Sequence, residues 1–303
     1  MNRKRKKGNR TETSSFGTKG RISHNASKFY NSNLYRALNQ NEGINGNENK
    51  LPKNLLNTHL LASSEDMSMV PNNSVHLVVT SPPYNVCKDY DNDLSLSEYL
   101  QMLKNAFEET YRVLIYGGRM CINVANVGRK PYIPLSDHIS KMMIKIGFNM
   151  RGEIIWDKGA SASHSTAWGS WASASNPTLR DIHEYILVFS KGDFKRQLSK
   201  EEMQSKKNSI SKENFLSWTK SIWTFKAESA KKIGHPAPFP IDLPDRLIQL
   251  YSFETDIILD PFMGSGTTAI AALKNKRQYL GFEVNREYIY LAKEREKTYL
   301  ESK

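Results

Sequence analysis

The sequence contains only two cysteines, Cys87 and Cys121, among 303 residues. Two cysteines are too few for a disulfide framework or a four-cysteine zinc site, which agrees with a reducing, intracellular environment. No run of about 18 apolar residues occurs, and no apolar stretch follows the basic start, so neither a membrane span nor a secretory signal is predicted. Hydrophobic residues make up 39% and charged residues 24%, which excludes a wholly disordered chain and predicts a folded, soluble protein.

Acidic residues are few: the sequence has 31 Asp and Glu residues against 43 Lys and Arg residues, which gives a net charge of +12. Such a field attracts polyanions, with nucleic acid as the first candidate. Residues 1–50 hold eleven Lys and Arg against three Asp and Glu, in a stretch rich in Asn, Ser and Gly. We therefore predict a basic, low-complexity, disordered tail over residues 1–50 that attracts phosphate without sequence preference.

After Pro52, short apolar runs alternate with longer helical patterns, which is typical of an α/β domain with a mostly parallel sheet. The patterns predict strands over residues 75–79, 120–124, 151–156, 184–189, 256–259 and 278–283, and helices over residues 96–115, 136–146, 244–251, 267–275 and 286–300. Gly117 and Gly118 are expected to end the first helix. Residues 158–180 predict a long loop, and residues 191–232 a basic and aromatic insertion.

Residues 257–269 combine a strand, a glycine turn and a helix start. Gly264 and Gly266 let a ligand approach the backbone, and the N–H groups of the helix start favour an anionic or zwitterionic ligand. Glu283 ends the next strand, where it can accept hydrogen bonds from a ribose diol. The pattern also satisfies the dinucleotide fingerprint, so an NAD enzyme is an alternative. Asp260, just before the turn, suits an amino-bearing ligand better than a pyrophosphate; a tight turn with a surface Glu is the structural alternative.

Residues 81–84, Ser-Pro-Pro-Tyr, follow a buried strand, and ligands of open parallel sheets bind at the carboxyl ends of strands. Two prolines fix the backbone and leave carbonyl groups without donors. This turn suits a planar ring with an amino group: Tyr84 can stack on the ring, while the Ser81 hydroxyl and the Pro82 carbonyl accept the amino hydrogens. The alternative is a rigid turn with Tyr84 packed in the core.

Three segments, residues 80–85, 235–240 and 260–267, together resemble the S-adenosylmethionine-dependent DNA amino-methyltransferases, over most of the chain after residue 51. The resemblance implies a Rossmann-like methyltransferase domain with a mixed, mostly parallel sheet, and S-adenosylmethionine as cofactor. The residues that it marks as catalytic are Ser81, Pro82, Pro83 and Tyr84. Those that it marks as cofactor-binding are Asp260, Pro261, Phe262, Gly264, Ser265, Gly266, Thr267 and Glu283, with His235 and Pro236 against the methionine part. No metal is expected.

The order of these motifs, catalytic first and cofactor-binding last, is similar to the permuted β group. It implies a catalytic half over residues 51–190, a small target-recognition insertion over residues 191–232 and a cofactor-binding half over residues 233–303. Ser81 at the first position of the tetrapeptide favours cytosine-N4 over adenine-N6 methylation. A non-catalytic nucleic-acid-binding module is an alternative from another class.

The resemblance implies double-stranded DNA as the partner, and a restriction endonuclease of the same specificity as a functional partner. It also implies that the protein acts in a prokaryotic cytoplasm, at the nucleoid. The target base must leave the duplex, and Trp168 and Trp171 can contact it or its orphaned partner, although packing against their own domain explains them equally well. We expect the amino proton to leave to water without a dedicated base. Neither cysteine follows a proline, so both are predicted to be small core residues rather than nucleophiles.

Overall fold

The computed structural model describes residues 31–36, 46–84, 94–159, 168–227 and 239–302. The chain divides into two compact units, residues 1–43 and residues 44–303. The described part of the first unit contains one helix, α2 (Asn33–Arg36). All other described helices and strands belong to the second unit. Of the tail predicted over residues 1–50, only residues 31–36 and 46–50 are described.

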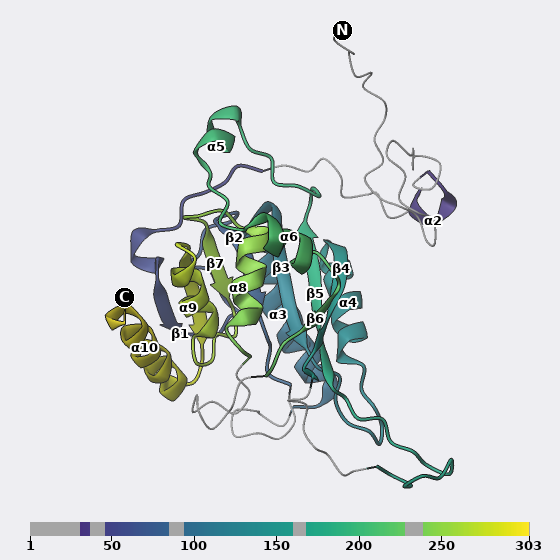
Figure 1. Cartoon of the computed structure of the whole chain (residues 1–303). Coiled ribbons are helices and arrows are strands. Elements are labelled where there is room, and N and C mark those ends of the chain that lie inside the picture. Colours follow the sequence, from purple (N-terminus) through teal and green to yellow (C-terminus); the bar gives the residue numbers. More distant parts are fainter. Residues whose placement is uncertain (1–30, 37–45, 85–93, 160–167, 228–238, 303) are drawn as a thin grey trace. The chain divides into compact units, whose positions relative to one another are not determined.

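The second unit is built on an eight-stranded sheet with the order β1-β8-β7-β2-β3-β5-β4-β6 (Figure 1). Every neighbouring pair is parallel except the two pairs formed by β5, which runs antiparallel to β3 and β4. The strands are β1 (Thr58–Leu61), β2 (Val75–Thr80), β3 (Leu114–Val124), β4 (Phe148–Asp157), β5 (His183–Lys191), β6 (Ile222–Thr224), β7 (Ile257–Asp260) and β8 (Gln278–Glu283). The predicted α/β fold with a mixed, mostly parallel sheet is confirmed.

Both faces of the sheet are covered, which explains why β2 is buried along its whole length. One core contains Val78 together with apolar residues of α3 (Leu96–Val113) and α4 (Leu135–Ile146). The other contains Leu77 and Val79 with residues of α8 (Asp242–Tyr251) and α9 (Thr267–Lys274). In Figure 1, α8 and α9 lie in front of the sheet and α3 behind it. The last helix, α10 (Arg286–Glu301), begins at the predicted cap Asn285, whose side chain accepts the Glu287 N–H.

The prediction that Gly117 and Gly118 end a helix was wrong. The helix α3 ends at Val113, and β3 begins at the next residue and runs through both glycines. Gly117 has a φ of +77°, and a Cβ there would lie 2.5 Å from the Cα of Arg196. The glycine therefore allows another backbone segment to approach the strand, a role that sequence alone does not distinguish from helix termination. The short strands β1 and β6 were not predicted, because three or four residues carry too little periodicity.

The strands β4 and β5 pair as an antiparallel hairpin, with Trp156 opposite Glu184. Because β5 also pairs with β3, the segment between β4 and β5 leaves the sheet at the edge where β2 and β3 end. In this segment the rings of Trp168 and Trp171 lie 5.0 Å apart, and the Arg180 guanidinium lies 4.1 Å from the Trp168 ring. Trp171 is 72% exposed.

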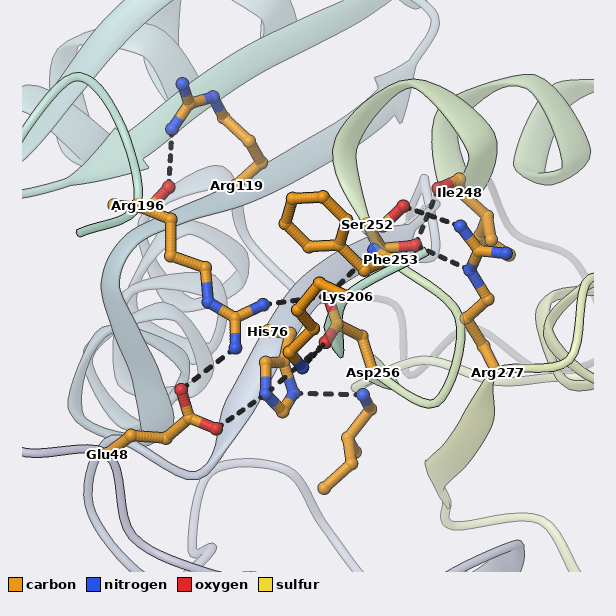
Figure 2. A network of polar contacts seen from close by, with 12 residues as sticks. Glu48, His76, Arg119, Arg196, Lys206, Ile248, Ser252, Phe253, Asp256 and Arg277 are labelled. Atoms are coloured by element: carbon orange, nitrogen blue, oxygen red, sulfur yellow. Dashed lines mark hydrogen bonds and ion pairs between the residues drawn. The ribbon is translucent and has the colours of Figure 1, made fainter. Parts of the chain in front are cut away.

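A network of charged side chains lies at the opposite edge of the sheet, where β2 and β7 begin (Figure 2). Asp256, just before β7, is 1% exposed and pairs with Arg196 at 2.8 Å and Lys206 at 2.6 Å. His76 of β2 lies 3.7 Å from Asp256 and contacts Glu48 at 2.9 Å. Burial by itself raises the pKa of Asp256, but the attraction of His76 and Arg196 and the Lys206 hydrogen bond outweigh it, so the pKa is lowered.

This network involves two basic residues of the segment for which target recognition was predicted. That segment forms α5 (Lys200–Ser205), α6 (Lys212–Trp218) and β6, and Trp223 is buried in the second core. Arg196 and Lys206 are paired with a buried carboxylate at the edge of the sheet remote from the carboxyl ends of β2 and β7. These two cations therefore stabilise the fold.

Replacing Asp256 with asparagine is expected to lower the free energy of unfolding by about 3 kcal/mol, because Arg196 and Lys206 lose their buried counter-charge. Urea denaturation measures this. The matched control is Glu254→Gln, because Glu254 pairs at 3.6 Å with Lys276, whose side chain is 76% exposed. It should cost at most about 0.5 kcal/mol. Equal losses in the two variants would contradict the importance of the network.

Within the described ranges, no helix is both long and apolar enough to cross a membrane.

Candidate active site

One cavity lies at the carboxyl ends of β2, β7 and β8, where the strand order reverses between β2 and β7. Its wall is formed by the turn after β2, the turn between β7 and α9, and residues that follow β1. The predicted site residues in this wall are Ser81, Pro82, Pro83, Tyr84, Pro261, Phe262, Gly264, Ser265, Thr267 and Glu283. The diproline turn and the glycine turn, far apart in the sequence, therefore open into the same space.

The diproline turn presents two hydroxyl groups that lie close together. The Oγ of Ser81 is 3.2 Å from the Tyr84 hydroxyl, and that hydroxyl donates to Glu184 at 3.2 Å. Burial raises the pKa of Tyr84 well above its usual range, and the charge of Glu184 adds to the increase. Tyr84 stays protonated at neutral pH and donates to Glu184. Its ring also packs against the first core, so it lines the cavity and supports the fold.

The glycine turn depends on left-handed backbone at two positions. Gly264 has a φ of +52° and Gly266, the N-cap of α9, a φ of +78°. A Cβ at Gly266 would lie 2.9 Å from the Cβ of Ala292 in α10, so Gly266 shapes the turn from behind and does not line the cavity. The hydroxyls of Ser265 and Thr267 accept hydrogen bonds from Arg295 at 2.8 and 3.2 Å. Arg295 thus fixes two cavity-lining side chains, which no local pattern had indicated.

Glu283 places a carboxylate in the cavity at the end of β8. Its oxygens accept the Gly264 N–H and the Asn285 N–H, each at 2.8 Å. Burial raises the pKa of Glu283, and these backbone donors only partly oppose the increase. Each oxygen of a carboxylate can accept more than one hydrogen bond, so Glu283 can hold a diol while it remains bound to the backbone.

Asp260 does not line the cavity, in contrast to the ligand contact predicted for it. It is 2% exposed, and its oxygens accept the hydroxyl protons of Thr80 and Thr268, both at 2.7 Å. One oxygen also accepts the Phe262 N–H at 3.1 Å. Asp260 therefore ties the end of β2 to the start of α9 and positions the two turns. A carboxylate at a strand end is compatible with either role, and only the packing of α9 decides between them.

Burial raises the pKa of Asp260 to about 6, and the two threonine hydroxyls only partly oppose this. Because the folded pKa exceeds the unfolded value, the fold favours the neutral acid, and stability is lost as the pH rises from about 4 through about 6. Asp260→Asn is expected to gain up to about 3 kcal/mol of stability relative to the native chain at pH 8, and much less at pH 4. Thermal unfolding across this range measures the difference. The exposed Asp242→Asn serves as the control, and a stability difference for Asp260→Asn that does not change with pH would refute the buried-charge argument.

His235, Pro236 and Cys87 lie outside the described residues, whereas Phe239, close behind the His-Pro motif, lines the cavity. Cys121 is a buried residue of the second core, as predicted, and burial raises the pKa of its thiol. It is therefore no candidate for a nucleophile.

Sequence reasoning missed the residues that enter the site from other elements. Residues 62–65 line the cavity after β1, and the Ala62 N–H donates to the Glu283 carbonyl at 3.0 Å. Tyr288 of α10 also lines it. Behind the diproline turn, Asn123 donates to Glu184 at 2.6 Å, and Glu184 pairs with Lys158. A polar residue at the start of a strand was the only signal for Glu184.

Comparison with known proteins decides the family. A family model described as DNA methylase, for N6 and N4 methylation, matches residues 75–294, well over half of the chain. The chain belongs to the N6/N4 DNA methylase family. It is a DNA methyltransferase that uses S-adenosylmethionine.

Relatives of the methyltransferase include type II methyltransferase M.MjaI of Methanocaldococcus jannaschii, 29% identical, with 75% of this chain and 86% of the relative covered. Orphan methyltransferase M.BamHII of Bacillus amyloliquefaciens is 30% identical, over 75% of this chain and 90% of the relative. A Thermus thermophilus protein, provisionally described as a DNA modification methylase and solved with S-adenosylmethionine, is 31% identical with a TM-score of 0.64. That match covers 80% of this chain and 93% of the solved chain.

The cytosine-N4-specific PvuII DNA methyltransferase shares the fold, with 20% identity and a TM-score of 0.61 over 84% of this chain and 94% of that chain.

Proposed function

We propose that the methyltransferase methylates the exocyclic amino group of a base in duplex DNA, with cytosine N4 as the favoured target. The observation that carries this proposal is the shared cavity, in which the turn over residues 81–84 faces the glycine turn and Glu283. An amino-recognising turn and a nucleoside-binding carboxylate in one space are what methyl transfer to a nucleobase requires.

Bound S-adenosylmethionine supplies a methyl group that its sulfonium already activates. The protein must activate the amino nitrogen, whose lone pair is delocalised into the base. The Ser81 hydroxyl and the Pro82 carbonyl accept the amino hydrogens, localise the lone pair on nitrogen and stabilise the charge that develops there. Tyr84 stacks on the base, which is worth about 1–3 kcal/mol. Glu283 holds the ribose diol.

The preference for cytosine rests on Ser81, since the resemblance associates serine at this position with N4 methylation. Adenine N6 is the second candidate, because it presents the same amino chemistry to the same acceptors. Digestion of methylated DNA to nucleosides, followed by mass spectrometry, separates the two bases. N6-methyladenine as the sole product would overturn the N4 assignment and leave the methyltransferase assignment intact.

We propose that DNA binds across the carboxyl edge of the sheet, since a flipped base must enter the cavity there. The segment between β4 and β5 emerges at this edge and carries Arg180, Trp168 and the exposed Trp171. Within residues 191–232, Arg196 and Lys206 do not read bases, because both pair with Asp256. Other side chains of this segment recognise the target sequence. The net charge of +12 supports binding to the phosphate backbone.

The relatives named as type II methyltransferases support a place in a restriction-modification system with an endonuclease of the same specificity, in a prokaryotic cytoplasm. Sequencing the methylated DNA of cells that express the protein yields the modified base and its context. Calorimetry with S-adenosylmethionine and NAD tests the cofactor, and binding of NAD alone would overturn the assignment.

A further inference from the structure

Glu184, the second residue of β5, lies directly behind the diproline turn. Its side chain is 12% exposed and contacts three partners, which come from three different parts of the chain. One oxygen accepts the Tyr84 hydroxyl at 3.2 Å and the Asn123 amide at 2.6 Å. The other pairs with the Lys158 ammonium at 2.5 Å. The chemistry described above uses Ser81 and Tyr84 but gives Glu184 no role.

We propose that Glu184 receives the proton that the target amino group releases, through the hydroxyls of Ser81 and Tyr84, in place of the direct transfer to water that the sequence led us to expect. This inference rests on the proposed function. The Ser81 Oγ lies 3.2 Å from the Tyr84 hydroxyl, which lies 3.2 Å from the Glu184 carboxylate. A hydrogen-bonded chain therefore leads from the amino-binding turn to a carboxylate outside the cavity wall.

The step balances as a proton relay. Once nitrogen has bonded to the methyl carbon and sulfur has kept the electron pair of the broken bond, the nitrogen carries one proton and one positive charge too many. An N–H bond then breaks toward the Ser81 oxygen, the Ser81 proton moves to Tyr84, and the Tyr84 proton moves to Glu184. The products are a neutral methylamino base and a neutral carboxylic acid, with both hydroxyls restored.

The surroundings of Glu184 suit this role. A positively charged exocyclic amine is strongly acidic, so even an ion-paired carboxylate is basic enough to accept its proton. Burial and Glu184 raise the pKa of Tyr84, so its hydroxyl passes a proton on and does not hold a negative charge. After the transfer, Lys158 faces a neutral acid in place of a carboxylate. Loss of the proton from Glu184 to water restores the ion pair and resets the site.

The titratable groups that face Glu184 in the described structure are Tyr84, from the turn after β2, and Lys158, after β4; the Asn123 side chain from β3 is neutral. Burial raises the pKa of Tyr84, so its hydroxyl keeps its proton in mildly acidic solution. An acid limb of the rate that depends on this cluster therefore reports the carboxylate.

The test is the single-turnover rate of methyl transfer by full-length Glu184→Gln on plasmid DNA that contains the methylated sequence. We expect a fall of about 100-fold, while the Kd for S-adenosylmethionine changes by less than about twofold. Glu153→Gln is the matched control, because Glu153 is exposed on the neighbouring strand β4 and should leave the rate unchanged. A wild-type rate in Glu184→Gln would overturn the inference.

The pH profile separates proton transfer from mere support of Tyr84. The wild-type rate should fall on acidification, because protonated Glu184 cannot accept a proton, and Glu184→Gln should lack this acid limb. An unchanged acid limb in the variant would overturn the relay.

Tyr84→Phe breaks the chain but leaves the Glu184–Lys158 pair in place, so it should show a similar loss of rate. The double variant should be no slower than either single one. If Glu184→Gln fails to fold, Tyr84→Phe carries the test, and a wild-type rate with an unchanged acid limb in it overturns the relay.

The inference and the proposed function fail in different ways. An active Glu184→Gln beside an inactive Ser81→Ala overturns the proton path alone. An active Ser81→Ala overturns the function assigned to the diproline turn, and the relay with it.

Discussion

Replacing Ser81 with alanine is expected to lower the single-turnover rate of methyl transfer by about 10²–10³-fold. The variant loses an acceptor that localises the amino lone pair as charge develops on nitrogen. Because Ser81 lies on the turn after β2 and not on the glycine turn or at Glu283, the Kd for S-adenosylmethionine should stay the same. Rapid-quench measurement of methyl transfer and calorimetry of cofactor binding separate these two effects.

The exposed Ser97 of α3 provides a control, since Ser97→Ala removes a hydroxyl that is not part of the cavity wall and should leave the rate unchanged. A parallel loss of cofactor binding and of rate in Ser81→Ala would show that the serine supports the cavity as a whole. That result would contradict its assignment to amino recognition.

Replacing Glu283 with alanine is expected to weaken S-adenosylmethionine binding by about 30–100-fold. Two charge-assisted hydrogen bonds to a diol are lost, each worth about 1.5–3 kcal/mol before water compensates in part. The Gly264 N–H also loses its acceptor, so the glycine turn loosens. Calorimetry measures the change, and Glu283→Gln, which keeps an acceptor oxygen, should lose less.

The demethylated product S-adenosylhomocysteine sharpens this test. A carboxylate that recognises the ribose does not sense the sulfonium charge, so both ligands should lose affinity by a similar factor. A loss confined to S-adenosylmethionine would assign Glu283 to electrostatic recognition of the sulfonium and contradict the diol contact. Glu287→Gln, an exposed change in the first turn of α10, is the control.

Local sequence was sufficient for most of the fold because strands and helices here bury whole faces. The run at residues 75–79 predicted a strand with both faces covered, and β2 is buried throughout. The prediction from local sequence was wrong at Gly117, because a left-handed glycine inside a strand has the same sequence signature as a helix end. The approach of Arg196 that requires this glycine comes from far along the chain.

Charge was the least predictable property. Arg196 and Lys206 contribute to a segment whose composition favours DNA binding, but both pair with buried Asp256. Asp260 has the sequence position of a ligand-binding carboxylate but binds two threonine hydroxyls. A charged side chain takes whichever partner the fold brings within about 3–4 Å, and sequence spacing does not contain that distance.

The sequence by itself determined the chemistry of the two turns, since prolines and glycines restrict the backbone locally whatever surrounds them. It also determined the alternation of strands and helices that gives the α/β class. Only the tertiary structure decided that both turns line one cavity, that Asp260 stands behind its wall, and that Glu184 reaches Tyr84 from a strand 100 residues away. Those outcomes depend on strand order and helix packing, which are set by burial summed over the whole chain.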